Sequence, residues 1–153
     1  MQPLLTNTEY YYHGDPAADA AAAGFIIFAI MVTFVLVLAL YALQAYLLSR
    51  IFRKGGEKEW KAWVPVYNNW VTLELGGQKG WWSVLALLPV VNIVALIFMY
   101  LAMYHIGLKL KKEGAFILLA IFLPLVWYAW LAFDSSTWKG KKPAHSAKAR
   151  QND

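Results

Sequence analysis

The chain has 153 residues, which is the usual size of a single domain. Hydrophobic residues make up 60% and charged residues 15%, whereas soluble globular domains average roughly 45–50% and about 25%. This composition excludes a disordered chain and argues against an ordinary soluble domain. The sequence has no cysteine, which excludes a disulfide scaffold, a thiolate metal site and a cysteine nucleophile. The net charge is +5, and its meaning depends on where the charges lie.

Three apolar blocks are long enough to cross a bilayer as helices. They cover residues 24–48, 81–104 and 115–133, and each has 19 to 25 residues, which suits a hydrocarbon core of roughly 30 Å. A buried helix of a soluble protein keeps one polar face, and these blocks show none. We therefore expect an all-α integral membrane protein with three transmembrane helices, in a membrane domain of residues 24–134.

A shorter apolar segment, residues 63–75, contains Pro65, Asn68, Asn69 and Glu74. It is too short to span a bilayer and too polar to face lipid without protein around it. We expect an interfacial or re-entrant segment there.

The basic residues predict the orientation of the spans. Residues 1–23 contain no Lys or Arg, residues 49–80 contain six, and the tail 135–153 contains five. Three spans with the N-terminus outside place 11 of the 14 basic residues in the cytoplasm, whereas a fourth crossing would leave only eight there. We expect an extracytoplasmic extension over 1–23, residues 105–114 outside, and a basic cytoplasmic tail over 135–153.

The first helix has a recognisable start. Asp15 suits the N-cap position and Pro16 the first turn, so the alanine-rich stretch 17–23 should extend this helix beyond the membrane. Tryptophans at segment ends, Trp81 and Trp82 among them, are expected to lie in the headgroup layer. Trp127 and Trp130 lie inside the third block, and we expect them to pack against a neighbour.

A short pattern occurs twice, as Pro65-Val66-Tyr67-Asn68 and as Pro89-Val90-Val91-Asn92, and Pro124 begins a weaker third copy. A proline inside a helix kinks it, and an asparagine one turn later needs hydrogen-bond partners. Two interpretations stay open. The pattern marks kinks with local hydrogen bonding, or Asn68 and Asn92 converge on each other, a ligand or a partner.

Few side chains in these blocks suit chemistry. Glu74 suits an ion pair with Lys79, or the handling of protons or cations. His105 is a weak candidate ligand, because a membrane haem usually needs a second histidine at the same depth. Lys79 and Ser83 have the spacing of a Ser/Lys hydrolase pair, but no second polar domain supplies an oxyanion hole. We expect no enzyme activity, no cofactor and no metal.

The basic tail is expected to attract anionic lipids, at about 1 kcal/mol per charge near the surface. Five basic residues without interleaved aromatics are weak support for nucleic-acid binding, so no nucleic-acid partner is expected.

Several motifs between Phe52 and Asp134 occur in a recognisable order. They are Phe52-Arg53-Lys54-Gly55-Gly56, Trp63, Pro65, Tyr67, Asn68, Leu73-Glu74-Leu75, Gly80-Trp81-Trp82, Leu88-Pro89-Val90-Val91-Asn92-Ile93, Phe122-Leu123-Pro124 and Asp134. The sequence thereby resembles an uncharacterised family of small bacterial multi-span membrane proteins, a domain of unknown function that is sometimes mislabelled signal peptidase I. The family's usual Phe-Gly-Asp motif lacks its glycine here, at Phe133-Asp134. The resemblance implies the bacterial inner membrane and several spans, and it implies no reaction.

These features favour a non-catalytic accessory or structural subunit of a larger membrane complex of the respiratory, photosynthetic or secretion type, with other membrane subunits as partners. The candidate structural or partner contacts are Pro65, Tyr67, Asn68, Glu74, Trp81, Trp82, Pro89, Asn92, Trp127, Trp130 and Asp134, with Tyr10-Tyr11-Tyr12 as an external contact. The alternative is a small transporter or channel component with a polar path at Asn68, Glu74 and Asn92.

Overall fold

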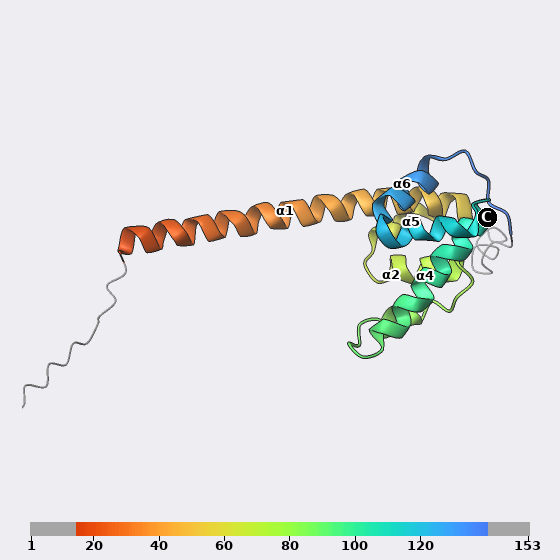
Figure 1. Cartoon of the computed structure of the whole chain (residues 1–153), viewed down its shortest axis with the longest axis horizontal. Coiled ribbons are helices and arrows are strands. Elements are labelled where there is room, and N and C mark those ends of the chain that lie inside the picture. The colour runs from red at the N-terminus through yellow and green to blue at the C-terminus, as the bar shows by residue number, and fades with distance from the viewer. Residues whose placement is uncertain (1–14, 141–153) are drawn as a thin grey trace, which may run out of the picture. The chain divides into compact units, whose positions relative to one another are not determined.

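The computed structural model describes residues 15–140 (Figure 1). The predicted Tyr10-Tyr11-Tyr12 contact and most of the basic tail lie outside these residues. Every regular element in 15–140 is a helix, which confirms the all-α prediction. The elements are α1 (Pro16–Gly55), η1 (Glu59–Trp63), α2 (Tyr67–Leu75), α3 (Trp82–Leu85), α4 (Asn92–Lys109), η2 (Gly114–Phe116), α5 (Ile117–Phe122) and α6 (Pro124–Phe133).

The chain divides into an N-terminal unit up to Ala39 and a C-terminal unit from Leu40. The described part of the N-terminal unit is the first half of α1. This helix begins at Pro16, where the carboxylate of Asp15 accepts a hydrogen bond from the Ala17 N–H at 3.0 Å, so the predicted helix start is confirmed. Because one helix cannot bury its own side chains, all residues from Pro16 to Leu40 are exposed.

The C-terminal unit has a hydrophobic core that joins the last turns of α1 to helices later in the chain. Ile51 and Phe52 of α1 are completely buried, and they share the core with α2, α4 and α6. Helix α2 packs against α4, and α5 packs against α6 (Figure 1). The predicted interfacial segment 63–75 therefore lies in the middle of this unit, where neighbouring helices bury most of α2. Its depth in a bilayer stays a prediction.

Two of the three predicted spans are not continuous helices. The block 81–104 is divided by a turn over 86–91 between α3 and α4. The block 115–133 is divided at Leu123, whose φ of −137° and ψ of 66° are not helical. Two described helices, α1 and α4, are long and apolar enough to cross a membrane by length and composition, so the prediction of three spanning helices is wrong.

Proline placement explains these breaks. Pro124 is the first residue of α6, and Pro89 and Pro65 lie in the turns that precede α4 and α2. Proline lacks an N–H and disfavours helical geometry in the preceding residue, so it begins helices more readily than it continues them. The predicted proline kinks are therefore wrong, and the repeated pattern marks helix starts.

The start of α2 is also strained. Val66 has a φ of 64°, and the N–H of Tyr67 bonds the carbonyl of Pro65 at 2.7 Å, which closes a tight three-residue turn. A β-branched residue rarely adopts this conformation, and such residues cost about 1–3 kcal/mol each.

Basic residues from three segments meet at one end of the C-terminal unit. Lys54 donates to the Asp134 carbonyl, Lys112 forms an ion pair with the Asp134 carboxylate, and the Lys139 N–H bonds the carbonyl of Lys109 at 2.7 Å. We call Lys54, Lys109, Lys112, Asp134 and Lys139 the basic junction. Three crossings would hold residues 105–114 a membrane thickness away from Lys54 and Asp134, so the predicted placement of 105–114 on the opposite side is wrong.

Two segments leave the basic junction and return to it. Lys109 donates to the carbonyl of Leu75, so both ends of residues 75–109 lie at this junction. Residues 112–134 likewise begin and end there, because Lys112 pairs with Asp134. Each segment is a helical hairpin, with its turn at 86–91 or at Leu123.

Replacing Gly76 by alanine should destabilise the C-terminal unit. An added Cβ at Gly76 would lie 2.3 Å from the Cα of Ala102, a backbone atom of α4 that cannot move without shifting the helix. We expect a loss of about 1–3 kcal/mol from this overpacking, measured by thermal unfolding in mild detergent.

Gly107→Ala is the matched control, because the nearest atom to its Cβ, on Phe116, is 3.9 Å away. Alanine also suits a helix better than glycine, so this variant should be neutral or more stable. Equal unfolding temperatures for the two variants would contradict the close contact between α2 and α4.

Candidate functional site

The segment between α1 and α2 is held by a buried ion pair. Lys61 Nζ lies 2.6 Å from Glu57 Oε2, and their side chains are 5% and 3% exposed. The same ammonium lies 5.8 Å from the centroid of the Tyr67 ring, which stacks on Trp60. Tyr67 therefore has a structural role close to the chain's buried charges.

Asn68 is buried and serves the local fold of α2. Its Nδ2 donates to the carbonyl of Ala62 at 3.4 Å, and its own carbonyl accepts from the hydroxyl of Thr72 at 2.7 Å. These partners lie within six residues of it in the sequence. No hydrogen bond joins Asn68 to Asn92 in the part of the chain that the structure describes.

Glu74 accepts a hydrogen bond from the indole N–H of Trp70 at 2.7 Å. Among the described residues it forms no ion pair with Lys79, so that predicted partner is wrong. Gly80 lies against Trp70 so closely that an added Cβ would be 2.3 Å from Nε1. Glycine at position 80 thus allows the Trp70 indole to reach Glu74.

The predicted tryptophan contacts differ in their surroundings. Trp82 stacks on Trp81 with ring centroids 4.6 Å apart and on Phe98 at 4.3 Å. Trp127 is 1% exposed and packs within the hydrophobic core of its own chain. Trp130 is 56% exposed and remains accessible to lipid or a partner.

A cavity of about 220 Å³ lies between α2, α3 and α4, and we call it the polar cavity after its three polar residues, although most of its lining is apolar. Its polar lining consists of Asn69, Ser83 and Asn92, and its apolar lining of Leu73, Trp82, Ala86, Ala95, Leu96 and Met99. Asn69 and Leu96 are exposed, so the cavity opens to the surface beside them. Of the polar path predicted at Asn68, Glu74 and Asn92, only Asn92 lies here.

Ser83 is the most unusual residue of the polar cavity. It is 3% exposed, and its hydroxyl has no hydrogen-bond partner in the part of the chain that is described. Lys79 does not line the cavity and does not bond this hydroxyl, so the pairing that a Ser/Lys mechanism needs is not formed. A hydroxyl and two amides can bind a ligand, but they supply no general base.

The sequence pattern does not single out Asn69, and it indicates Ser83 only through its spacing from Lys79. One signal was present along α4, where Asn92, Ala95, Leu96 and Met99 follow helical spacing and so share one face. The small side chains of Ala86 and Ala95 leave space at this face. The neighbouring elements that close the cavity could not be inferred from spacing within α4.

His105 offers little for a cofactor. Its Nδ1 is buried without a hydrogen-bond partner in the described residues, and its ring meets Tyr104 edge-on at 5.5 Å. No cluster of three or more histidine, aspartate or glutamate residues suited to a metal ion occurs within residues 15–140.

The basic junction satisfies carbonyls at helix C-termini. Lys54 Nζ donates to the Leu131 carbonyl at 2.6 Å as well as to that of Asp134, and Lys109 donates to that of Leu75. Such carbonyls lack partners within the helix and carry the negative end of its dipole, so ammonium groups stabilise them. The Lys112 ammonium beside Asp134 lowers the pKa of that carboxyl.

Comparison with known proteins gives one family. The model of a family described as "Family of unknown function (DUF5684)" matches residues 60–141, which is more than half of the chain. No curated protein and no solved structure matches. The matched region contains the polar cavity and most of the basic junction, and excludes α1.

Replacing Asp134 by asparagine should remove part of the acid sensitivity of the fold. Lys112 lowers the folded-state pKa of Asp134, so the carboxylate stabilises the fold fully above its unfolded-state pKa of about 3.9. This contribution is lost as the pH falls through the lower folded-state pKa. The variant should unfold at a lower temperature at neutral pH, and the two unfolding temperatures should converge below about pH 4. If the unfolding temperatures of the two proteins instead kept a constant difference down to about pH 2, the ion pair would not contribute to the stability of the fold.

Proposed function

The chain belongs to DUF5684, a family of unknown function, and we propose that it is a non-catalytic accessory subunit of a larger bacterial inner-membrane assembly. In this proposal α1 crosses the membrane with the N-terminus outside. The basic junction lies on the cytoplasmic side together with the C-terminus. Other membrane subunits, in an assembly of the respiratory, photosynthetic or secretion type, cover part of the apolar surface.

The observation that carries this proposal is the unburied apolar surface of α1. Its large side chains from Phe25 to Leu38 are all at least half exposed, with Phe25 at 71%. A contiguous apolar surface of this length is unfavourable in water and suits lipid or partner helices. Residues 25–43 contain no charged side chain and are followed by Arg50, Arg53 and Lys54 on the expected cytoplasmic side.

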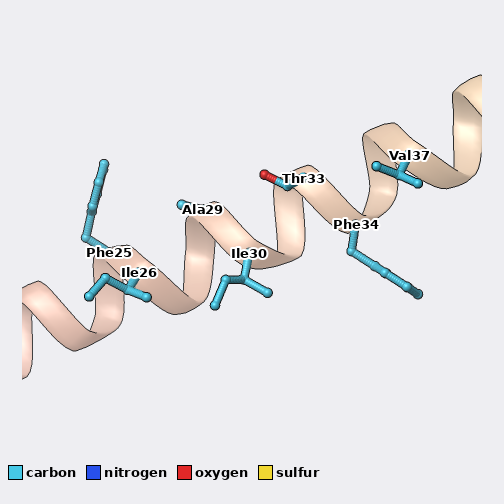
Figure 2. A pocket seen from close by; sticks show the side chains of 7 residues that line it. All are labelled: Phe25, Ile26, Ala29, Ile30, Thr33, Phe34 and Val37. Carbon is cyan, nitrogen blue, oxygen red and sulfur yellow. The ribbon is translucent and has the colours of Figure 1, made fainter. Parts of the chain in front are cut away.

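One face of α1 also has a shape that suits a second helix. Figure 2 shows two rows of side chains, with Ala29 and Thr33 between Phe25 and Val37 in one row and Ile26, Ile30 and Phe34 in the other. Small residues one turn apart let two helix backbones approach closely, and a threonine hydroxyl can bond across such an interface. We call this face the Ala29–Thr33 face.

The basic junction supports the orientation. The C-terminal unit contains the described basic residues of 50–79, 109–112 and 139, and both of its hairpins return to one end. A single crossing by α1 would therefore place these basic residues together in the cytoplasm. Exposed apolar side chains lie in or next to both hairpin turns, Val90 at 84% and Phe122 at 76%, which suits contact with the bilayer. The transporter alternative has less support, because Asn68, Glu74 and Asn92 do not line a common cavity.

Photo-crosslinking from α1 tests for a partner helix. A photoreactive phenylalanine analogue at Thr33, on the Ala29–Thr33 face, should give a protein adduct of one defined mass in native membranes. The same analogue at Val35, almost opposite on the helix, should give mainly lipid adducts. Adduct masses by gel electrophoresis and mass spectrometry provide the measurement.

The proposal fails if neither position yields a protein adduct and the tagged chain migrates in mild detergent as a lone 17.3 kDa species. Equal protein adducts from both positions would contradict the Ala29–Thr33 face as the contact.

Cysteine labelling tests the single crossing. The sequence has no cysteine, so Lys58→Cys, Glu113→Cys and Asp19→Cys each introduce the only thiol. An impermeant maleimide applied outside sealed cells should label Asp19→Cys alone, whereas inverted vesicles should expose the other two. Labelling of Glu113→Cys from outside would restore the three-crossing arrangement and contradict the proposed one.

A further inference from the structure

The polar cavity has the chemistry of a ligand site. We propose that it binds a small uncharged molecule with a flat ring that carries carbonyl or hydroxyl groups, the quinone and quinol class. This site lies entirely within the C-terminal unit and is independent of the partner contact proposed for α1. Three observations define the ligand.

The first observation is the unpaired hydroxyl of Ser83. A buried polar group without a partner is destabilising, so native proteins seldom leave one unless something else satisfies it. Ser83 lines the cavity together with the amides of Asn69 and Asn92. A hydroxyl and amide N–H groups can donate to a ligand carbonyl, and the amide oxygens can accept from a ligand hydroxyl.

The second observation is that the cavity lining is neutral. None of its nine lining residues is a Lys, Arg, His, Asp or Glu. Burial of an ion without a counter-charge is strongly unfavourable, so phosphates, carboxylates and ammonium ions are poor ligands here. An uncharged molecule loses less solvation free energy than an ion when it enters the cavity.

The third observation concerns shape and the apolar wall. Trp82 is fixed in the wall by its stack with Phe98, and the Met99 thioether lies in the same lining. Aromatic rings and thioethers make favourable contacts with aromatic rings such as that of a quinol. The volume of about 220 Å³ is below the range of about 300–1,000 Å³ for drug-sized ligands, so it fits a single ring system. An apolar tail could leave beside Leu96, which is exposed.

The test uses the full chain in mild detergent and a benzoquinone that carries a decyl tail as the probe. Saturable quenching of tryptophan fluorescence is expected, and the quinone should also raise the unfolding temperature. Ser83→Ala should weaken binding about 3- to 10-fold, which corresponds to one hydrogen bond. Ala86→Leu, which fills the cavity, should abolish saturable binding.

Ser49→Ala is the matched control, because Ser49 is equally buried but bonds the Tyr46 carbonyl at 2.6 Å outside the cavity. This variant should bind the probe as the wild type does. Ser83→Ala should unfold at or above the wild-type temperature without ligand, since it removes an unpaired buried hydroxyl, so weak binding cannot be attributed to misfolding.

Three results would overturn the inference. The wild type could show no saturable quenching, or Ala86→Leu could bind the quinone as tightly as the wild type. Saturable stabilisation by a polyol such as glycerol, with none by the quinone, would identify a site for a different ligand class.

Discussion

The requirement that helix carbonyls find donors shapes the C-terminal unit more than any other interaction. Three helices, α1, α4 and α6, end at the basic junction, and a fourth, α2, is tied to it by Lys109. Carbonyls at a helix C-terminus have no partner within the helix, and in an apolar unit few other donors are available. The lysines supply these donors and place positive charge at the negative ends of several helix dipoles.

This arrangement determines how the apolar residues are used. Because residues 75–109 and 112–134 both start and finish at the basic junction, each is a hairpin whose turn lies away from the charges. Exposed apolar side chains such as Val90 and Phe122 lie in or next to the turns, and the core of the unit contains Trp127 and Phe52. The polar cavity lies within the first hairpin and its contact with α2. The proposed accessory role uses both parts, with α1 as the proposed membrane anchor and the basic junction as the charged end of the C-terminal unit.

The length of an apolar block in this sequence is not the length of a helix, which is why two of the three predicted spans are wrong. Residues 81–104 and 115–133 have the composition of spans, but Pro89 and Pro124 each lie where one helix stops and the next begins. A proline is compatible with a kinked helix as well as with a helix start, and only the surrounding backbone distinguishes the two. The number of basic residues on each side of the membrane depends on the number of crossings that is assumed. This number therefore could not show that two of the three apolar blocks are not continuous helices.

The sequence alone determined the helical class, the start of α1 at Asp15 and Pro16, and the relation to an uncharacterised family. Each depends on local propensity, composition or motif order, which are properties of neighbouring residues. The tertiary structure decided that Lys54, Lys112 and Asp134 meet, and that Asn69 and Ser83 face one cavity with Asn92. These contacts join residues far apart in the chain. Which of them form depends on the direction of each hairpin, and that direction depends on how whole helices pack together.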